Sequence, residues 1–141
     1  MKSEANLGEL IVAQMAEAVI YCDRRGVIER WNAAATAVFG FTAEEALGHG
    51  LDLIIPEHLR AAHWRGFDAA VARGSTRLQG RASITRGLHK SGRKCYVEMS
   101  FALLHDASGT VLGSIAVARD VSERIEREKQ AAAAAAAPKT S

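Results

Sequence analysis

The chain has 141 residues, of which 48% are hydrophobic and 24% are charged, values that are typical of a globular domain and exclude a wholly disordered chain. Its 18 basic and 16 acidic residues leave a net charge of +2, which is too balanced to favour nucleic-acid binding. Two cysteines do not make a disulfide framework, and no apolar stretch approaches the roughly 20 residues that span a bilayer. We therefore expect a cytoplasmic protein that binds neither nucleic acid nor membrane.

The first part of the chain predicts a helix followed by a β-hairpin. Apolar residues recur at helical spacing between residues 7 and 16, and this segment predicts an N-terminal flanking helix within residues 1–16. Two β-rich runs, residues 18–23 and 27–32, are separated by a turn that contains Gly26. Such a pair of short runs around a glycine turn is typical of a hairpin.

Capping residues predict two short helices directly after the hairpin. Asn32 is a good N-cap for a helix at residues 33–39, and Gly40 is placed to end it. Thr42 and Glu45 have the spacing of a capping box, which predicts the start of a second helix.

A longer helix and three strands are expected next. Pro56 suits the first position of a helix, where its missing N–H is not needed, and this helix should continue to about Arg73, before Gly74. Alternating or β-rich sequence then predicts three strands, at residues 76–88, 94–105 and 110–119.

The end of the chain predicts a last helix at residues 121–137, with Asp120 as its N-cap. The alanine run at residues 131–137 either prolongs this helix or frays, and residues 138–141 are expected to be a disordered tail. The whole order of elements predicts an α+β fold, with one antiparallel sheet covered on one face by helices. Because the helical insert must cross the sheet, a cavity between the two is expected.

Several blocks of the sequence, in order, resemble the PAS family of bacterial sensory domains. They are AVIYCDRRGVIERWNAAA from residue 18, FGFTAEEALG from residue 39, IIPEHLR from residue 54, HKSGR from residue 89 and GSIAVARDVSER from residue 113. The resemblance covers about residues 7–130 and departs from the family at Ser91, where an aspartate is usual. It implies the PAS fold, a five-stranded antiparallel sheet with a helical insert between strands 2 and 3. Residues 17–120 would form the sensor core.

The segment at residues 56–67 is similar to the long helix of haem-binding PAS domains in oxygen-sensing kinases and phosphodiesterases. In those proteins the histidine at the place of His63 binds the haem iron. Leu59, His63 and Phe67 recur at four-residue spacing, so they share the helix face that should look toward the sheet. A neutral imidazole there can bind iron, and the resemblance then implies b-type haem that senses a diatomic gas or the redox state. The alternative is a hydrogen-bonded core histidine.

The opposite wall of the expected cavity would come from the sheet and the strand before it. The candidate lining residues are Leu78, Val97, Met99, Phe101 and Ile115. Met99 is a candidate sixth ligand because a thioether suits haem iron, although the resemblance puts the family's methionine ligand at Arg81. An ungapped comparison puts Ser83 where the oxygen-sensing kinases carry an arginine, which weakens oxygen specificity. Arg81 and Arg86 either pair with propionates or lie in solvent.

Other chemistry receives less support from the sequence. Residues 51–62 lack the cysteine that light-sensing relatives need for a flavin adduct, so a non-covalent flavin or no cofactor at all remains as an alternative. No phosphate-binding loop, nucleophile motif or zinc-ligand spacing occurs, and we expect a protein that is not an enzyme.

The flanking helices suggest how the domain meets its partners. The apolar face of residues 7–15 exceeds what one small sheet covers, which predicts a homodimer. The resemblance implies that the C-terminal helix carries the signal to an effector, such as a histidine kinase or a cyclic-dinucleotide enzyme. The alternative is a non-haem PAS interaction and dimerisation module, with a filled core or another small ligand.

Overall fold

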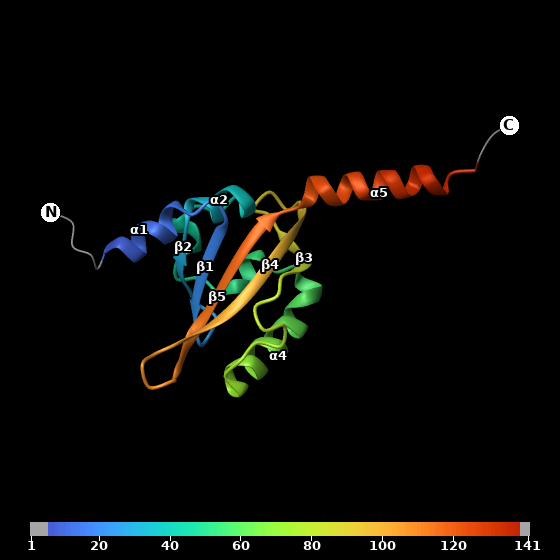
Figure 1. Ribbon diagram of the computed structural model, residues 1–141. Coiled ribbons are helices and arrows are strands. Elements are labelled where there is room, and N and C mark those ends of the chain that lie inside the picture. The colour runs from blue at the N-terminus through green and yellow to red at the C-terminus, as the bar shows by residue number, and fades with distance from the viewer. Residues whose placement is uncertain (1–5, 139–141) are drawn as a thin grey trace.

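The computed structural model describes residues 6–138, and it confirms the predicted α+β architecture (Figure 1). One antiparallel sheet has the strand order β2-β1-β5-β4-β3. Its strands are β1 (Ala18–Asp23), β2 (Ile28–Trp31), β3 (Ser83–Leu88), β4 (Lys94–His105) and β5 (Val111–Asp120). The helical insert between β2 and β3 comprises α2 (Ala33–Phe39), α3 (Ala43–Ala46), the 3-10 turn η2 (Leu51–Ile54) and α4 (Glu57–Arg73).

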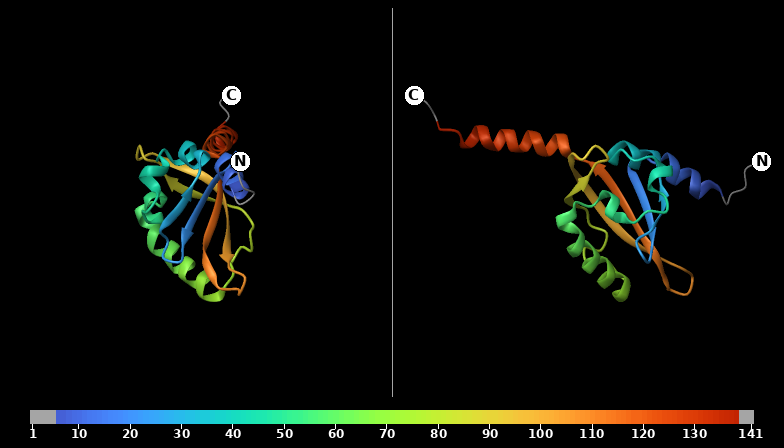
Figure 2. Two further views of the ribbon diagram at one scale, coloured as in Figure 1. Left: turned by 90° about the vertical axis from the view of Figure 1, so that its left-hand side faces the viewer. Right: turned by 180° about the vertical axis from the view of Figure 1, so that it is seen from behind.

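The insert covers one face of the sheet, as the two further views make plain (Figure 2). The flanking helices α1 (Leu7–Gln14) and α5 (Ser122–Ala136) extend away from this body (Figure 1). The buried core lies between the insert and the inner face of the sheet, where Phe39, Ile20 and Ile28 are among the largest fully buried side chains. This layered arrangement leaves α4 facing the strands across the interior.

Local signals in the sequence predict the hairpin and the two short helices correctly. Gly26 adopts a positive φ of 83° in the turn between β1 and β2, a conformation that glycine takes without steric strain. The Asn32 side chain accepts a hydrogen bond from Ala35 N and so caps α2. Thr42 and Glu45 form the complete capping box that begins α3. These predictions are confirmed.

The predicted strand at residues 76–88 was wrong in its first half, because β3 begins only at Ser83. Residues 76–82 form turns, in which Gln79 and Gly80 have φ values of 51° and 81°. Two successive left-handed residues cannot continue an extended strand. Gly80 marks a possible turn in the sequence, but nothing in the sequence indicates that Gln79 also adopts a left-handed conformation.

Two predicted helix starts also moved by one residue. Pro56 is the N-cap of α4 and not its first helical residue. Val121 takes the N-cap position of α5, while Asp120 ends β5 and accepts a hydrogen bond from Ser122 N at 2.8 Å. The alanine run does prolong α5, to Ala136. The predicted tail lies outside the described residues from position 139 onward.

Candidate functional site

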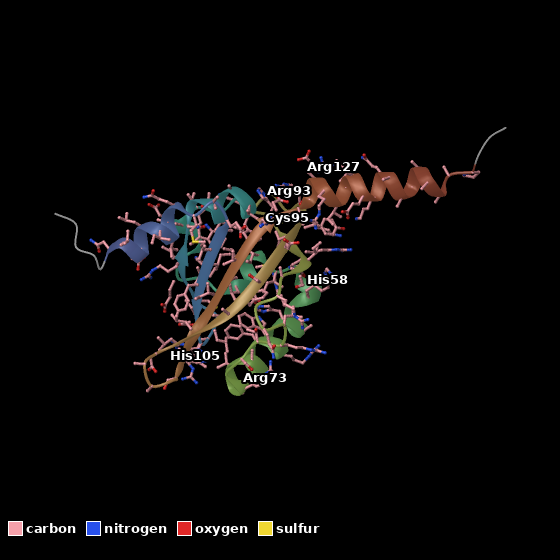
Figure 3. All side chains as sticks on the ribbon, viewed as in Figure 1. His58, Arg73, Arg93, Cys95, His105 and Arg127 are labelled. Atoms are coloured by element: carbon pink, nitrogen blue, oxygen red, sulfur yellow. The ribbon has the colours of Figure 1, made fainter. Side chains whose placement is uncertain are left out.

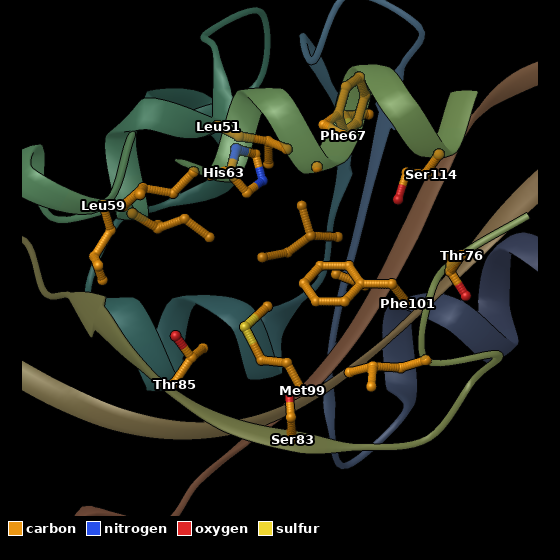
Figure 4. A pocket seen from close by; sticks show the side chains of 18 of the residues that line it. Leu51, Leu59, His63, Phe67, Thr76, Ser83, Thr85, Met99, Phe101 and Ser114 are labelled. Carbon is orange, nitrogen blue, oxygen red and sulfur yellow. The ribbon is translucent and has the colours of Figure 1, made fainter. Parts of the chain in front are cut away.

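A cavity of about 460 Å³ lies between α4 and the inner face of the sheet (Figure 4). This volume is in the range of about 300–1,000 Å³ that small-molecule and cofactor sites occupy. Most of its wall is apolar, from both layers, and includes Ile20, Leu51, Leu59, Phe67, Met99 and Phe101. The interior is therefore hollow, which speaks against the alternative of a filled core.

His63 lies on the α4 wall of this cavity, and its imidazole projects from the helix toward the interior (Figure 4). Leu59 and Phe67, one helical turn before and after it, line the same cavity because side chains four residues apart share a helix face. The imidazole packs edge-on against Trp64, with ring centroids 4.8 Å apart. Trp64 in turn donates a hydrogen bond from Nε1 to Asp52 Oδ1 at 2.7 Å.

Burial sets the charge state of His63. Desolvation lowers the pKa of the imidazole below its usual value of 6.5, and the opposing effects of the Asp52 and Asp68 carboxylates are smaller. Nδ1 is buried and has no hydrogen-bond partner among residues 6–138. The ring is therefore neutral near pH 7, which is the form of histidine that binds metals.

The lowered pKa of His63 predicts a pH dependence of stability. Below about pH 6.5 the unfolded chain binds a proton at this position more readily than the folded protein does, so acid favours unfolding. We expect the free energy of unfolding to fall between pH 7.5 and pH 5, and to fall less steeply in a His63→Gln variant. Urea denaturation of both proteins across this range measures the effect. Identical slopes would contradict it.

The sheet side of the cavity places hydroxyl groups and a thioether across from His63 (Figure 4). Ser83 and Thr85 come from β3, Met99 from β4 and Ser114 from β5. In the β3–β4 register Ser83 lies opposite Met99, so these two share the inner face. This wall offers weak hydrogen-bonding groups of the kind that can contact a small ligand.

The structure brings Leu78 to the cavity together with the residues above, but it keeps three predicted residues out of it. Ile115 pairs with Tyr21 and Ala102 on the outer face, so the expectation that it lines the cavity was wrong. Ser114 and Ala116 line the cavity in its place.

Val97 and Arg81 are the other two residues that do not line the cavity. Val97 is fully buried in the core on the inner face of β4, opposite Thr85. Arg81 is exposed in the turn before β3, where its Nε donates to Leu78 O at 3.1 Å.

Sequence reasoning missed two arginines at the cavity wall, Arg73 and Arg77, which join Arg86 there. Arg73 ends α4, at the opposite end from His58 (Figure 3), and Arg77 follows it by four residues. The sequence shows this spacing, but it does not predict the turns at residues 76–82 that place Arg77 at the cavity wall. The Arg86 guanidinium lies over the Tyr96 ring on the outer face of the sheet, 5.9 Å from the ring centroid. Arg73 and Arg77 are therefore the two arginines that can place positive charge beside this otherwise apolar space.

Cys22 also lines the cavity. Burial raises the pKa of its thiol to about 11, so the group stays protonated near pH 7 and is a poor nucleophile. Within residues 6–138 no group of three or more His, Cys, Asp or Glu side chains could hold a metal ion. In the same part of the chain, no helix is long and apolar enough to cross a membrane.

Comparison with known proteins now identifies the fold family. The sequence model of the PAS fold matches residues 12–126. The chain belongs to the PAS family. In accordance with this, the PAS domain of a protein from Colwellia psychrerythraea superimposes with a TM-score of 0.75, at 18% identity, over 86% of this chain and 100% of that one.

Two longer proteins contain a segment similar to this PAS domain. An uncharacterized protein of Azorhizobium caulinodans is 36% identical over 110 residues, which is 77% of this chain and 15% of that protein. The oxygen sensor protein DosP of Escherichia coli is 28% identical over 100 residues, which is 71% of this chain and 12% of DosP. The PAS domain thus spans only a small part of the length of these relatives.

Proposed function

We propose that this PAS domain is a non-catalytic, cytoplasmic sensor that binds b-type haem through His63 and responds to a diatomic gas or to the redox state. The observation that carries the proposal is the His63 imidazole, which is neutral, unpaired at Nδ1 and directed into an apolar cavity. The similarity to DosP supports it. When bound, haem would supply an iron atom with one coordination position for His63 and one for a second ligand.

The other cavity residues fit a flat, amphipathic group of this kind. Leu59, Phe67, Leu78 and Phe101 provide apolar contacts for its two faces. Arg73 and Arg77 would pair with its carboxylates because guanidinium groups bind carboxylates strongly. Met99 would be the candidate for the second position in the absence of a gas, and the Ser83 hydroxyl would contact a gas bound there instead.

Titration of the purified protein with haemin tests this proposal. We expect a Soret band that saturates at one haem per chain, and a shift of that band when the reduced protein meets carbon monoxide. A colourless protein that takes up no haemin would overturn the haem assignment. A parallel titration with a flavin would then test the non-covalent flavin alternative.

We also propose that residues 17–120 act as the sensor core of a homodimer and that residues 121–137 pass the signal to an effector. A histidine kinase or a cyclic-dinucleotide enzyme is the kind of effector that fits a PAS sensor. The dimer is supported by the exposed apolar side chains of α1, since Leu7 is 58% exposed and Ile11 is 54% exposed. Apolar groups gathered on one exposed helix favour association.

The dimer proposal predicts that Ile11→Glu shifts the protein to monomer. A charge at this position would be buried on association and would strongly disfavour it. Sedimentation velocity over a range of protein concentrations measures the change. Ala13→Glu is the control, because it adds the same charge on a different side of α1. Equal effects of the two substitutions would contradict a specific interface through Ile11.

A further inference from the structure

The C-terminal helix α5 is held by contacts of its start and middle with the outer face of β4. Val121 N donates to Tyr96 O at 2.8 Å, and Ser122 Oγ accepts from Tyr96 N at 2.8 Å. Lys129 Nζ donates to the Tyr96 hydroxyl at 2.7 Å. No residue of α5 is buried, so a few polar contacts set the direction in which this helix leaves the domain (Figure 1).

Glu98 also lies on the outer face of β4, and its ion pairs connect α5 with the segment between α1 and β1. Its Oε2 lies 3.8 Å from Arg124 Nη2 in α5, and its Oε1 lies 3.9 Å from Arg119 Nε in β5. Arg119 is held on its other side by Glu17, with Nη2 2.7 Å from Oε1. Glu17 belongs to the segment between α1 and β1. Four alternating charges thus run from the N-terminal flank to the C-terminal helix.

The distances show that Glu98 is shared between two cations while Arg119 pairs closely with Glu17. The Glu98 side chain is 30% exposed, against 59% for Arg119 and 44% for Arg124. An arginine that engages a carboxylate with both arms of its guanidinium occupies both oxygens. Such a bidentate pair between Arg119 and Glu98 would turn both oxygens toward Arg119 and neutralise the Glu98 charge, and this would weaken the attraction of Glu98 for Arg124.

We propose that Glu98 is a positioning residue through which the N-terminal flank controls the docking of α5. While Glu17 holds Arg119, Glu98 is available to Arg124 and the first turn of α5 stays docked. When the segment before β1 moves and Glu17 withdraws, Arg119 takes Glu98 and Arg124 is released. This control goes beyond the proposed haem site and does not depend on what the cavity holds.

The competing explanation is that these are independent surface ion pairs, each of which contributes little to stability. The two explanations differ in the sign of their effects. Independent pairs predict that loss of Arg119 loosens the structure as loss of Glu17 does. Competition for Glu98 predicts that loss of Glu17 loosens α5, and that loss of Arg119 does not, because Arg124 then has Glu98 to itself.

Amide hydrogen exchange of residues 124–129 in the ligand-free protein distinguishes them. For Glu17→Gln we expect exchange to be about two- to five-fold faster, the range that an exposed ion pair can supply, although Glu17 does not contact α5. Residues 124–129 of Arg119→Gln should exchange no faster than those of the parent protein. The double variant Glu17→Gln/Arg119→Gln should exchange at the same rate as Arg119→Gln alone. Glu98→Gln should be as fast as Glu17→Gln.

Glu9→Gln is the matched control, since Glu9 lies in α1 of the same flank and pairs at 2.9 Å with Arg30 of β2, which is not among the ion pairs of Glu98. It should leave the exchange of α5 unchanged. The proposal is overturned if Glu17→Gln has no effect on α5, if Glu9→Gln has the same effect, or if Arg119→Gln is equally fast. Because no haem is added, failure here is separate from failure of haem binding.

Discussion

Replacing His63 with alanine is expected to remove the Soret band of the haem-loaded protein and to weaken haemin binding by more than about 100-fold. Changes in groups that only support a metal ligand already lower affinity by about 10–100-fold, and His63 would be the ligand itself. His63 is the one histidine on the cavity wall, within the part of the chain that the structure describes. Absorption spectra after haemin titration and desalting measure the loss.

Two controls separate ligation from general damage. His58→Ala removes a histidine from the exposed first turn of the same helix and should leave the spectrum unchanged. Added imidazole should restore the Soret band of His63→Ala, because the cavity that the substitution enlarges can admit the free base. An intact Soret band in His63→Ala would show that iron is bound elsewhere, with Met99 the first residue to examine.

The parts of this fold that could be predicted from the sequence depend on contacts between near neighbours. The caps of α2 and α3 join residues only three apart: the Asn32 side chain accepts from Ala35 N, and the Thr42 side chain accepts from Glu45 N. The helical face that carries His63 follows from a fixed rotation per residue. None of these features requires knowledge of the rest of the chain.

The errors arise where distant segments decide the outcome. Which face of β5 is buried depends on its register with β1, in which Ser114 lies opposite Cys22 and Ala116 opposite Ile20. The apolar sequence of β5 fits either face, so Ile115 looked as suitable for the interior as Ala116. A one-residue change of register moves every side chain to the other face.

The size of the cavity and the arginines at its wall could not be predicted from the sequence either. The cavity depends on how far α4 stands from the sheet, which the packing of Trp64 helps to set. The Trp64 indole ring occupies the place that a β-carbon on Gly26 would take. Contacts between residues so far apart along the chain leave no local pattern in the sequence.

Asn32→Ala is expected to lower the free energy of unfolding by about 2–6 kcal/mol, because it leaves two buried backbone N–H groups unpaired at about 1–3 kcal/mol each. The Asn32 Oδ1 accepts from Val19 N and Ala35 N, both at 3.0 Å. Its Nδ2 donates to Val12 O at 2.8 Å and to Glu17 O at 3.1 Å. One side chain thus ties α1, β1 and α2 together. Urea denaturation of the ligand-free protein measures the loss.

Thr42→Ala provides the comparison, since Thr42 also caps a helix but its side chain bonds only within the exposed start of α3. Loss of such a cap lowers stability by about 0.5–2 kcal/mol, typically about 1. Asn32→Ala should be clearly more damaging, because it removes bonds to α1 and β1 in addition to the cap. Equal losses in the two variants would mean that Asn32 acts only as a local cap, and that other contacts hold α1 against the core.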